Sequence, residues 1–314
     1  MARRSALALA LVLGALAAPA AAQPGAETLR GPRIDVVFAI DATGSMADEI
    51  QQVKQHLWAT ANGILQGDPQ PDVRFGLVVY RDRSDSEHTR VVPLTRDVDA
   101  IHRELMNLQA TGGGDYPEDV DAALQLAVDE MNWSDTGARL VFLIGDAPPK
   151  DYGVDRNGLL ERARRAEITF HTVQASGMTP EGGTLFTQIA QLTGGEAEIL
   201  TYRQMIAHNG RQRLLLRRGE EVFMSRRPLR ERERALSFRE LRSRNLIQPA
   251  PAAVARRAAP ARPGRRMTRG RAGGGSPRSA APAAAAPVEF SDSDIGGIVN
   301  REARRAAEAE GVAY

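Results

Sequence analysis

The chain has 314 residues, of which 42% are hydrophobic, and a formal net charge of +2 at pH 7. This composition allows one sizeable core, and the absence of cysteine excludes disulfide bonds, thiolate metal sites and thiol catalysis. The small net charge conceals a division, because residues 23–200 carry 15 basic against 28 acidic residues and residues 201–248 carry 13 arginines against 5 glutamates. The basic half is expected to dock on the acidic half or to meet an anionic partner.

Residues 1–22 have the pattern of a secretory signal peptide. Arg3 and Arg4 precede an apolar run, and the small residues 18–22 form a cleavage site, with the cut expected after Ala22. The apolar run is too short to cross a bilayer and no other run approaches the required length, so we expect no transmembrane span. The mature protein is therefore expected to be exported, either to the periplasm or as a secreted protein.

Between residues 33 and 200, short apolar runs alternate with segments whose apolar residues recur at helical spacing. This alternation predicts an α/β fold, with a Rossmann-like, doubly wound, mostly parallel sheet and helices on both faces. Pro93 suits an edge strand, because proline cannot donate a hydrogen bond to a neighbouring strand. In chain order, the expected strands are 36–40, 73–80, 91–94, 140–145, 168–173 and 196–200, and the expected helices are 46–65, 98–108, 117–131, 153–166 and 184–192.

The first expected strand ends in a polar loop. In the stretch IDVVFAIDATGSM, residues 34–46, the apolar run is followed by Asp41, Thr43 and Ser45 at every second position. Open α/β sheets keep their sites at the carboxyl ends of buried parallel strands. One carboxylate and two hydroxyls from one loop suit Mg²⁺, which prefers a compact shell of oxygen ligands and retains some waters.

Two later segments supply further oxygen atoms. The stretch ATGGGDYPED contains three glycines, which allow tight backbone conformations, together with Thr111, Asp115 and Glu118. In the stretch LVFLIGDAPPKD, a second continuous apolar strand ends at the carboxylate of Asp146. We expect the three segments to converge on one divalent cation.

The pattern D-x-T-x-S after an apolar strand resembles the metal-ion-dependent adhesion site of von Willebrand factor type A domains. The resemblance covers residues 33–200. It implies that Mg²⁺, with Mn²⁺ or Ca²⁺ as alternatives, is bound by Asp41, Thr43, Ser45 and Asp146, the last often through a water molecule.

The resemblance leaves the ligand from the second segment open. The residues Asp115-Tyr116-Pro117-Glu118 are similar to the Asp-Ala-Pro-Glu stretch in the A domains of integrin β chains, which points to Glu118, whereas simpler members of the family point to Thr111. Asp115 is the third candidate. The resemblance also implies a protein-binding module of the adhesion type, and not an enzyme, in which an Asp or Glu of a partner protein completes the metal shell.

A different class of protein shares part of this pattern. The Asp41 loop also looks like the nucleophile loop of haloacid dehalogenase-like phosphatases, in which Asp41 would attack phosphorus and Asp146 and Asp151 would hold Mg²⁺. Such enzymes need a basic residue, usually lysine, shortly before the acidic motif. The only lysines, Lys54 and Lys150, are not placed there. The phosphatase is therefore the alternative function.

Three segments follow the expected α/β domain. Residues 201–248, rich in arginine with interspersed leucines, are expected to form a helical extension. Residues 249–287 consist mainly of Ala, Pro, Arg and Gly and are expected to be a disordered linker. Residues 288–314 are expected to contain a short docking helix. The linker arginines suit an anionic surface such as a membrane face, and export argues against nucleic acid as the partner.

Overall fold

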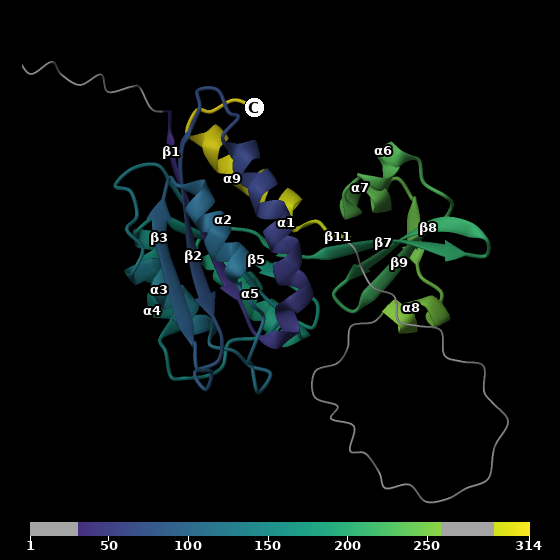
Figure 1. Ribbon diagram of the computed structural model, residues 1–314, viewed down its shortest axis with the longest axis horizontal. Helices are drawn as coiled ribbons and strands as arrows, with labels where there is room; N and C mark the ends of the chain where they lie inside the picture. Colours follow the sequence, from purple (N-terminus) through teal and green to yellow (C-terminus); the bar gives the residue numbers. More distant parts are fainter. Residues whose placement is uncertain (1–30, 259–291) are drawn as a thin grey trace, which may run out of the picture.

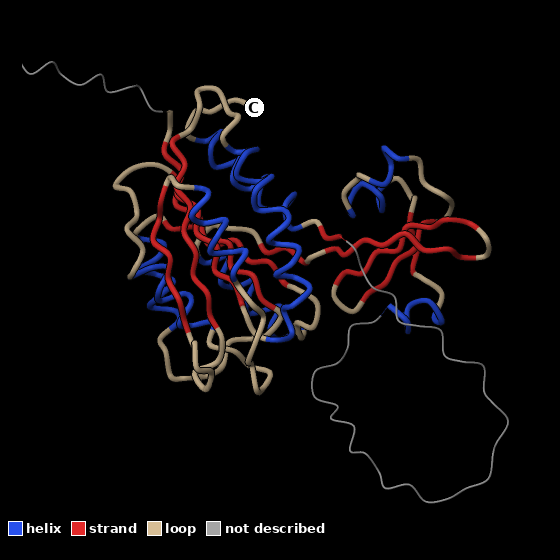
Figure 2. Tube along the Cα trace, in the orientation of Figure 1, coloured by secondary structure: helices blue, strands red, loops and turns tan. Residues whose placement is uncertain are grey.

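The computed structural model describes residues 31–258 and 292–314, which form two units side by side (Figure 1). The expected signal peptide, residues 1–22, and most of the expected linker, residues 249–287, lie outside the described residues. The first unit is an α/β domain, and the second is a smaller antiparallel sheet with short helices (Figure 2).

The first unit is built on a six-stranded sheet in the order β3-β2-β1-β4-β5-β6. Neighbouring strands are parallel except for β3, which pairs antiparallel with β2 and lies at the edge, where Pro93 predicted it. The expected α/β fold with a mostly parallel sheet is confirmed. The strands are β1 (Arg33–Asp41), β2 (Asp72–Tyr80), β3 (Thr89–Thr95), β4 (Ala138–Gly145), β5 (Ile168–Gln174) and β6 (Ala197–Ile199).

Helices cover both faces of this sheet (Figure 1). Phe38 of β1 lies in a core shared with α1 and α2, while Val37 faces a second core shared with α3, α4 and α5. Because β1 is buried on both sides, its residues 36–40 are continuously apolar and do not alternate with polar residues. The elements are η1 (Gly44–Met46), α1 (Ala47–Ile64), α2 (Val98–Asn107), α3 (Val120–Asp129), α4 (Arg156–Arg165) and α5 (Pro180–Leu192).

The last helix, α9 (Ile295–Ala309), returns to the first unit, where it packs on α1 (Figure 1). Its apolar residues Ile298 and Ala303 are buried in the same core as Phe38. The short helix expected within residues 288–314 therefore docks its apolar face on the α/β domain. A helix this short gains its stability mainly from such packing, which explains why it forms despite the glycines of its first turn.

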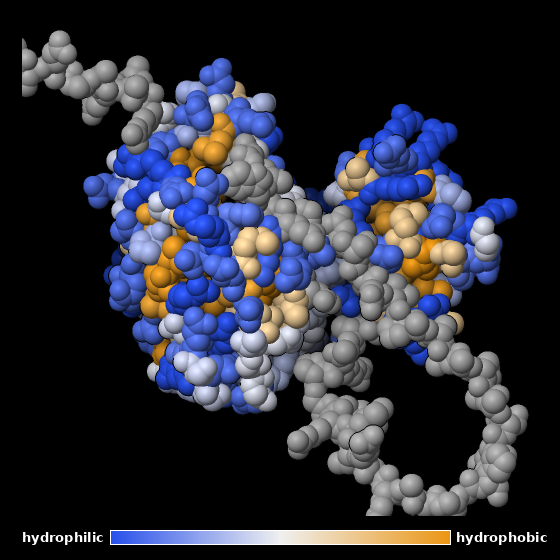
Figure 3. Space-filling view, viewed as in Figure 1, coloured by the Kyte–Doolittle hydropathy of each residue, from blue (hydrophilic) through white to orange (hydrophobic). Residues whose placement is uncertain are grey.

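The second unit is a five-stranded antiparallel sheet in the order β10-β9-β8-β7-β11. Short helices flank it, and Figure 3 shows a patch of hydrophobic side chains at its centre with hydrophilic side chains around the patch. Its elements are β7 (Thr201–His208), β8 (Arg211–Arg218), β9 (Glu221–Ser225), α6 (Glu231–Arg234), α7 (Phe238–Ser243), β10 (Ile247–Pro249), α8 (Ala252–Ala258) and β11 (Asp292–Ser293).

The expectation of a helical extension over residues 201–248 is wrong, because this region is mostly strand, with only α6 and α7 helical. Leu214 and Leu216 enter one apolar cluster and Leu215 enters another on the opposite face of the sheet. This two-residue period is that of a strand buried on both sides. The sequence signal for a β-hairpin here was the pair Asn209-Gly210. Both residues have positive φ angles, 50° and 72°, as tight hairpin turns require.

The chain joins the two units twice. It passes from β6 into β7 at Leu200, and β11 pairs with β7 immediately before α9 returns to α1. Leu200 and Tyr202 are both buried in the core of the first unit. In the described part of the chain, no helix is both long enough and apolar enough to cross a membrane.

Candidate functional site

The carboxyl ends of β1 and β4 meet at one edge of the first sheet. The two strands are neighbours with Ile40 opposite Ile144, so Asp41 and Asp146 emerge at the same edge. From β1 the chain continues to β2 on one side, and from β4 to β5 on the other, so the strand order reverses at this point. Crevices at such a reversal are the usual ligand sites of open α/β sheets.

Asp41 is fully buried and is held by the turn that follows it. Its Oδ1 accepts hydrogen bonds from the Thr43 backbone N at 2.9 Å and from the Thr43 hydroxyl at 2.7 Å. The Thr43 and Ser45 hydroxyl oxygens lie 3.2 Å apart. Within residues 31–258 and 292–314, Asp41 Oδ2 has no hydrogen-bond partner. The first loop thus places one free carboxylate oxygen beside two hydroxyls.

The glycine loop brings the second segment against the first. The Gly44 N donates to the Gly112 carbonyl at 3.2 Å, and the Thr111 N donates to the Ala42 carbonyl at 2.9 Å. A Cβ on Gly113 would lie 2.6 Å from Thr43 Cβ and 2.9 Å from Oε1 of Glu118. Only glycine permits this close approach, so the loop explains how Glu118 reaches the Asp41 turn.

Glu118 and Asp146 complete the cluster of acidic side chains. Both are buried, and Glu118 Oε2 and Asp146 Oδ1 make no hydrogen bond within the described residues. The Glu118 backbone is fixed, because its N donates to the Pro148 carbonyl at 3.1 Å and its carbonyl accepts from the Lys150 N at 2.8 Å. The loops after β4 and before α3 are therefore tied to each other.

The electrostatics show how closely these groups interact. Burial raises the pKa of Asp41 to about 6, although the Thr43 hydrogen bonds oppose the shift. Burial, followed by the charge of Asp41, raises the pKa of Asp146 to about 8 and that of Glu118 to about 9. The pKa of the buried Tyr80 hydroxyl is raised by burial and by the same three carboxylates. The carboxylates of Asp41, Glu118 and Asp146 are therefore close enough for their negative charges to repel one another.

The other two candidates of the second segment lie differently. Thr111 is exposed, and its backbone N serves the loop contact with Ala42. The side chain of Asp115 is 58% exposed and pairs with Lys150 Nζ at 2.9 Å. Glu118 is the one member of this segment whose buried carboxylate faces Asp41.

Oxygen atoms of two kinds make up this cluster. Within the described ranges, no group of three or more acidic or histidine side chains forms a ready-made metal site. The hydroxyls of Thr43 and Ser45 lie beside the Asp41 carboxylate. A cation at this point would therefore be held by carboxylate and hydroxyl oxygens together.

Two residues of the loop after β2 support the site without having been identified from the sequence. The buried Arg81 donates from Nε to the Ala42 carbonyl and from Nη2 to the Gln109 carbonyl, both at 3.0 Å. The Asp85 carboxylate accepts from the Gly113 N at 3.0 Å. A charged loop gave no local signal for this role, because each contact joins segments more than 25 residues apart in sequence.

This doubly wound sheet, with acidic and hydroxyl groups at its strand reversal, defines a class of α/β domains with a site at the carboxyl edge. The chain belongs to the von Willebrand factor A domain family, whose sequence profile matches residues 35–201. Domains of this family are typically protein-interaction modules and usually not catalytic.

Relatives are found in animals and in a slime mould. The chain is 32% identical over 180 residues to von Willebrand factor A domain-containing protein 7 of Rattus norvegicus, covering 52% of this chain and 19% of the relative. It is 30% identical over 116 residues to alpha-protein kinase vwkA of Dictyostelium discoideum, covering 37% and 18%. It is 28% identical over 172 residues to hemicentin-2 of Mus musculus, covering 54% and 3%. The chain thus spans less than a fifth of each of these relatives.

Proposed function

We propose that the first unit is an exported, adhesion-type module that binds a partner protein through a divalent cation. The observation that carries the proposal is a set of three buried oxygens, Asp41 Oδ2, Glu118 Oε2 and Asp146 Oδ1, that have no hydrogen-bond partner among the described residues. Buried carboxylates without partners are costly. A cation bound among them would remove both the unsatisfied oxygens and the mutual repulsion.

The donor set suits Mg²⁺, with Mn²⁺ or Ca²⁺ as alternatives. Asp41, Thr43 and Ser45 would hold the ion from one loop, and Glu118 and Asp146 would add oxygens directly or through water. All are hard oxygen donors, the type that Mg²⁺ prefers. Because two of the donors are neutral hydroxyls and Mg²⁺ usually keeps some waters, a partner's Asp or Glu could replace a water and bind in its place.

The rim of the site combines an aromatic ring with paired charges. Arg83 stacks over the Tyr152 ring at 3.9 Å, and Lys150 lies 5.5 Å from the same ring. Each of these two cations also pairs with a carboxylate of the same domain at 2.6 Å. They belong to different loops, 81–90 and 148–155, and we propose that the shape of this rim selects the partner.

The alternative, a phosphatase with Asp41 as nucleophile, has less support. Lys150, the lysine closest in sequence to Asp146, is engaged by Asp82 at 2.6 Å and by Asp115 at 2.9 Å. Its ammonium group is thereby held at the rim and not beside Asp41. We propose that the protein is not an enzyme.

Calorimetric titration of the metal-free protein with Mg²⁺ tests the proposal, with Asp41→Asn as the variant and Asp135→Asn as the control. Asp135 is exposed on the loop before β4, at the amino end of that strand. We expect Asp41→Asn to lose at least about tenfold in affinity, corresponding to 1.4 kcal/mol, and Asp135→Asn to bind as the natural sequence does. Equal binding by both variants would refute the metal site, and aryl phosphate hydrolysis that disappears with Asp41→Asn would favour the phosphatase.

Two further segments of the sequence, residues 1–22 and 249–287, extend this proposal. If residues 1–22 are removed on export, the module acts in the periplasm or outside the cell, and the arginines of residues 249–287 meet an anionic surface there. A partner pull-down from the exported fraction, with and without chelator, tests the first point. Binding to anionic liposomes over a salt series tests the second, since a binding level that does not fall with salt would contradict it.

A further inference from the structure

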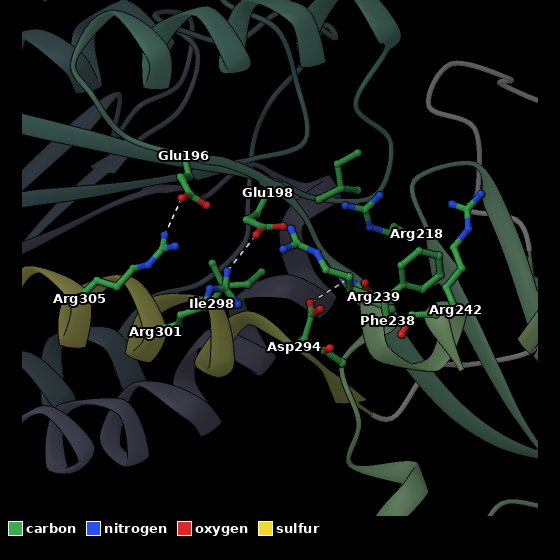
Figure 4. A pocket seen from close by; sticks show the side chains of 14 residues that line it. Glu196, Glu198, Arg218, Phe238, Arg239, Arg242, Asp294, Ile298, Arg301 and Arg305 are labelled. Atoms are coloured by element: carbon green, nitrogen blue, oxygen red, sulfur yellow. Dashed lines mark hydrogen bonds and ion pairs between the residues drawn. The ribbon is translucent and has the colours of Figure 1, made fainter. Parts of the chain in front are cut away.

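A cleft of about 630 Å³ lies where the two units meet, apart from the candidate metal site (Figure 4). It is bounded by β6 and α9 of the first unit and by β8 and α7 of the second. Its volume is in the range that small-molecule sites occupy, about 300–1,000 Å³. The lining is strongly charged, with five arginines among its residues.

The wall formed by α9 has more acidic than basic groups, because Glu302 also pairs with both of its arginines and Asp294 lines the cleft as well. Arg301 pairs with Glu198 at 2.9 Å, and Arg305 pairs with Glu196 at 2.5 Å (Figure 4). Each guanidinium on this wall therefore faces a carboxylate of the strand β6 region. This side of the cleft therefore offers no excess of positive charge to a ligand, and an anion would bind toward the other side.

The opposite wall carries an excess of positive charge. Arg218 of β8 and Arg239 and Arg242 of α7 line it, and across the described ranges none of the three forms an ion pair with a carboxylate. The guanidinium of Arg218 is positioned by the Phe238 ring, whose centroid lies 5.2 Å from its Cζ. Figure 4 shows Phe238, Arg239 and Arg242 on the short helix that faces α9.

The two walls are joined by fixed contacts and not merely by the linker. Asp294, at the start of α9, accepts a hydrogen bond from the Thr201 N of β7 at 2.8 Å. Two residues earlier, β11 pairs with β7 of the second sheet. Because α9 itself packs on α1, these contacts hold both walls in one arrangement, and the cleft exists before any ligand binds.

We propose that this cleft binds a small molecule bearing two or more phosphate groups, with the phosphates toward Arg218, Arg239 and Arg242. Guanidinium groups form paired hydrogen bonds with phosphate oxygens, and a phosphate group carries up to about two negative charges in a small volume. The site is a cleft between two units, a shape that suits a small molecule better than a membrane surface or a nucleic acid duplex. Residues 249–287 contain 8 arginines and no acidic residue, so this segment cannot neutralise the wall.

Calorimetric titration of the full chain with pyrophosphate, in the presence of EDTA, tests this proposal without involving the candidate metal site. The variant is the double substitution Arg239→Gln with Arg242→Gln, and the matched control is Arg211→Gln. Arg211 is also exposed, but it lies at the hairpin end of β8, seven residues from Arg218. Asp41→Asn serves as the second control, because it leaves this cleft unchanged.

We expect one pyrophosphate per chain, an affinity that falls by at least about tenfold in the double variant, and unchanged affinity in both controls. Equal weakening by Arg211→Gln would show diffuse charge attraction and overturn the proposal, as would an unchanged affinity in the double variant. A glutamate peptide of equal charge that binds as tightly as pyrophosphate would also overturn it, because the cleft would then select acidic peptides.

Discussion

The hydroxyl of Tyr202, on the first strand of the second unit, donates a hydrogen bond of 2.5 Å to Oε1 of Glu49. Glu49 lies in the first turn of α1, directly after the Asp41 loop, and its charge contributes to the raised pKa values of Asp41 and Asp146. The second unit is therefore anchored on a carboxylate that the candidate metal site senses electrostatically.

The first prediction concerns this anchor. In the natural sequence, two hydroxyls contact Oε1 of the buried Glu49, that of Tyr202 and that of Ser176, which lies 2.8 Å away. In Tyr202→Phe, only the Ser176 hydroxyl remains. Loss of a hydrogen bond to a buried charged group should lower the free energy of unfolding by about 1.5–3 kcal/mol. Chemical unfolding measures this. The control is Tyr314→Phe, whose hydroxyl bonds the Ile64 carbonyl from a partly exposed position, and equal losses in both variants would contradict the prediction.

A second prediction concerns the glycine loop. Gly113→Ala would place a Cβ 2.6 Å from Thr43 Cβ at a residue whose φ is +75°, so the loop must move. We expect a loss of about 1–3 kcal/mol in stability and weaker Mg²⁺ binding. The neighbouring variant Gly114→Ala is the control, because its Cβ would meet no atom of the described chain within 4 Å. Normal Mg²⁺ binding by Gly113→Ala would show that the loop does not position the site.

The third prediction is a pH dependence of the metal-free protein. The pKa values of Asp41, Asp146 and Glu118 are raised to about 6, 8 and 9 in the folded state, above the ordinary values of 3.8 and 4.5. The folded state therefore binds more protons than the unfolded state between these limits, and stability should fall as pH rises from about 4 to about 9. Melting temperatures in EDTA across this range measure the fall.

The matched variants for this pH series are Glu118→Gln and Asp146→Asn, which remove one titrating group each. Both should flatten the dependence, and saturating Mg²⁺ should reverse it for the natural sequence, because the ion favours the ionised carboxylates. A melting temperature that rises with pH in EDTA would be inconsistent with three crowded, unneutralised carboxylates.

The fourth prediction separates the second unit from the site. Leu216 of β8 is fully buried in a cluster with Phe223 of β9 and Leu241 of α7, so Leu216→Ala should cost about 2–5 kcal/mol through the cavity it leaves. The control is Leu192→Ala. Because Leu192 is 46% exposed, this change should alter the free energy of unfolding by less than about 0.5 kcal/mol. Chemical unfolding measures the stability of each variant, and Mg²⁺ titration of the same variants measures metal affinity. We expect Leu216→Ala to keep its Mg²⁺ affinity, because the apolar clusters of the two units are separate.

Much of the first unit could be predicted from local pattern. Continuous apolar runs at 36–40 and 140–144 indicated strands buried on both faces, and the parallel alternation put Asp41 and Asp146 at one edge. Such an inference succeeds because the period of a buried strand and the direction of a parallel sheet are properties of short segments. The choice among Thr111, Asp115 and Glu118 could not be made in this way.

The burial of Glu118 near the Asp41 turn, and the form of the second unit, depend on the tertiary structure. Glu118 faces Asp41 because Gly113 packs against Thr43, seventy residues earlier, and Asp115 turns away because Lys150 binds it. The arginines of residues 201–248 masked a strand period that Leu214, Leu215 and Leu216 satisfy only when both faces of a sheet are covered. The sequence by itself determined which segments end in oxygen donors. Long-range packing decided which donors meet, because the partners of each loop lie on other strands.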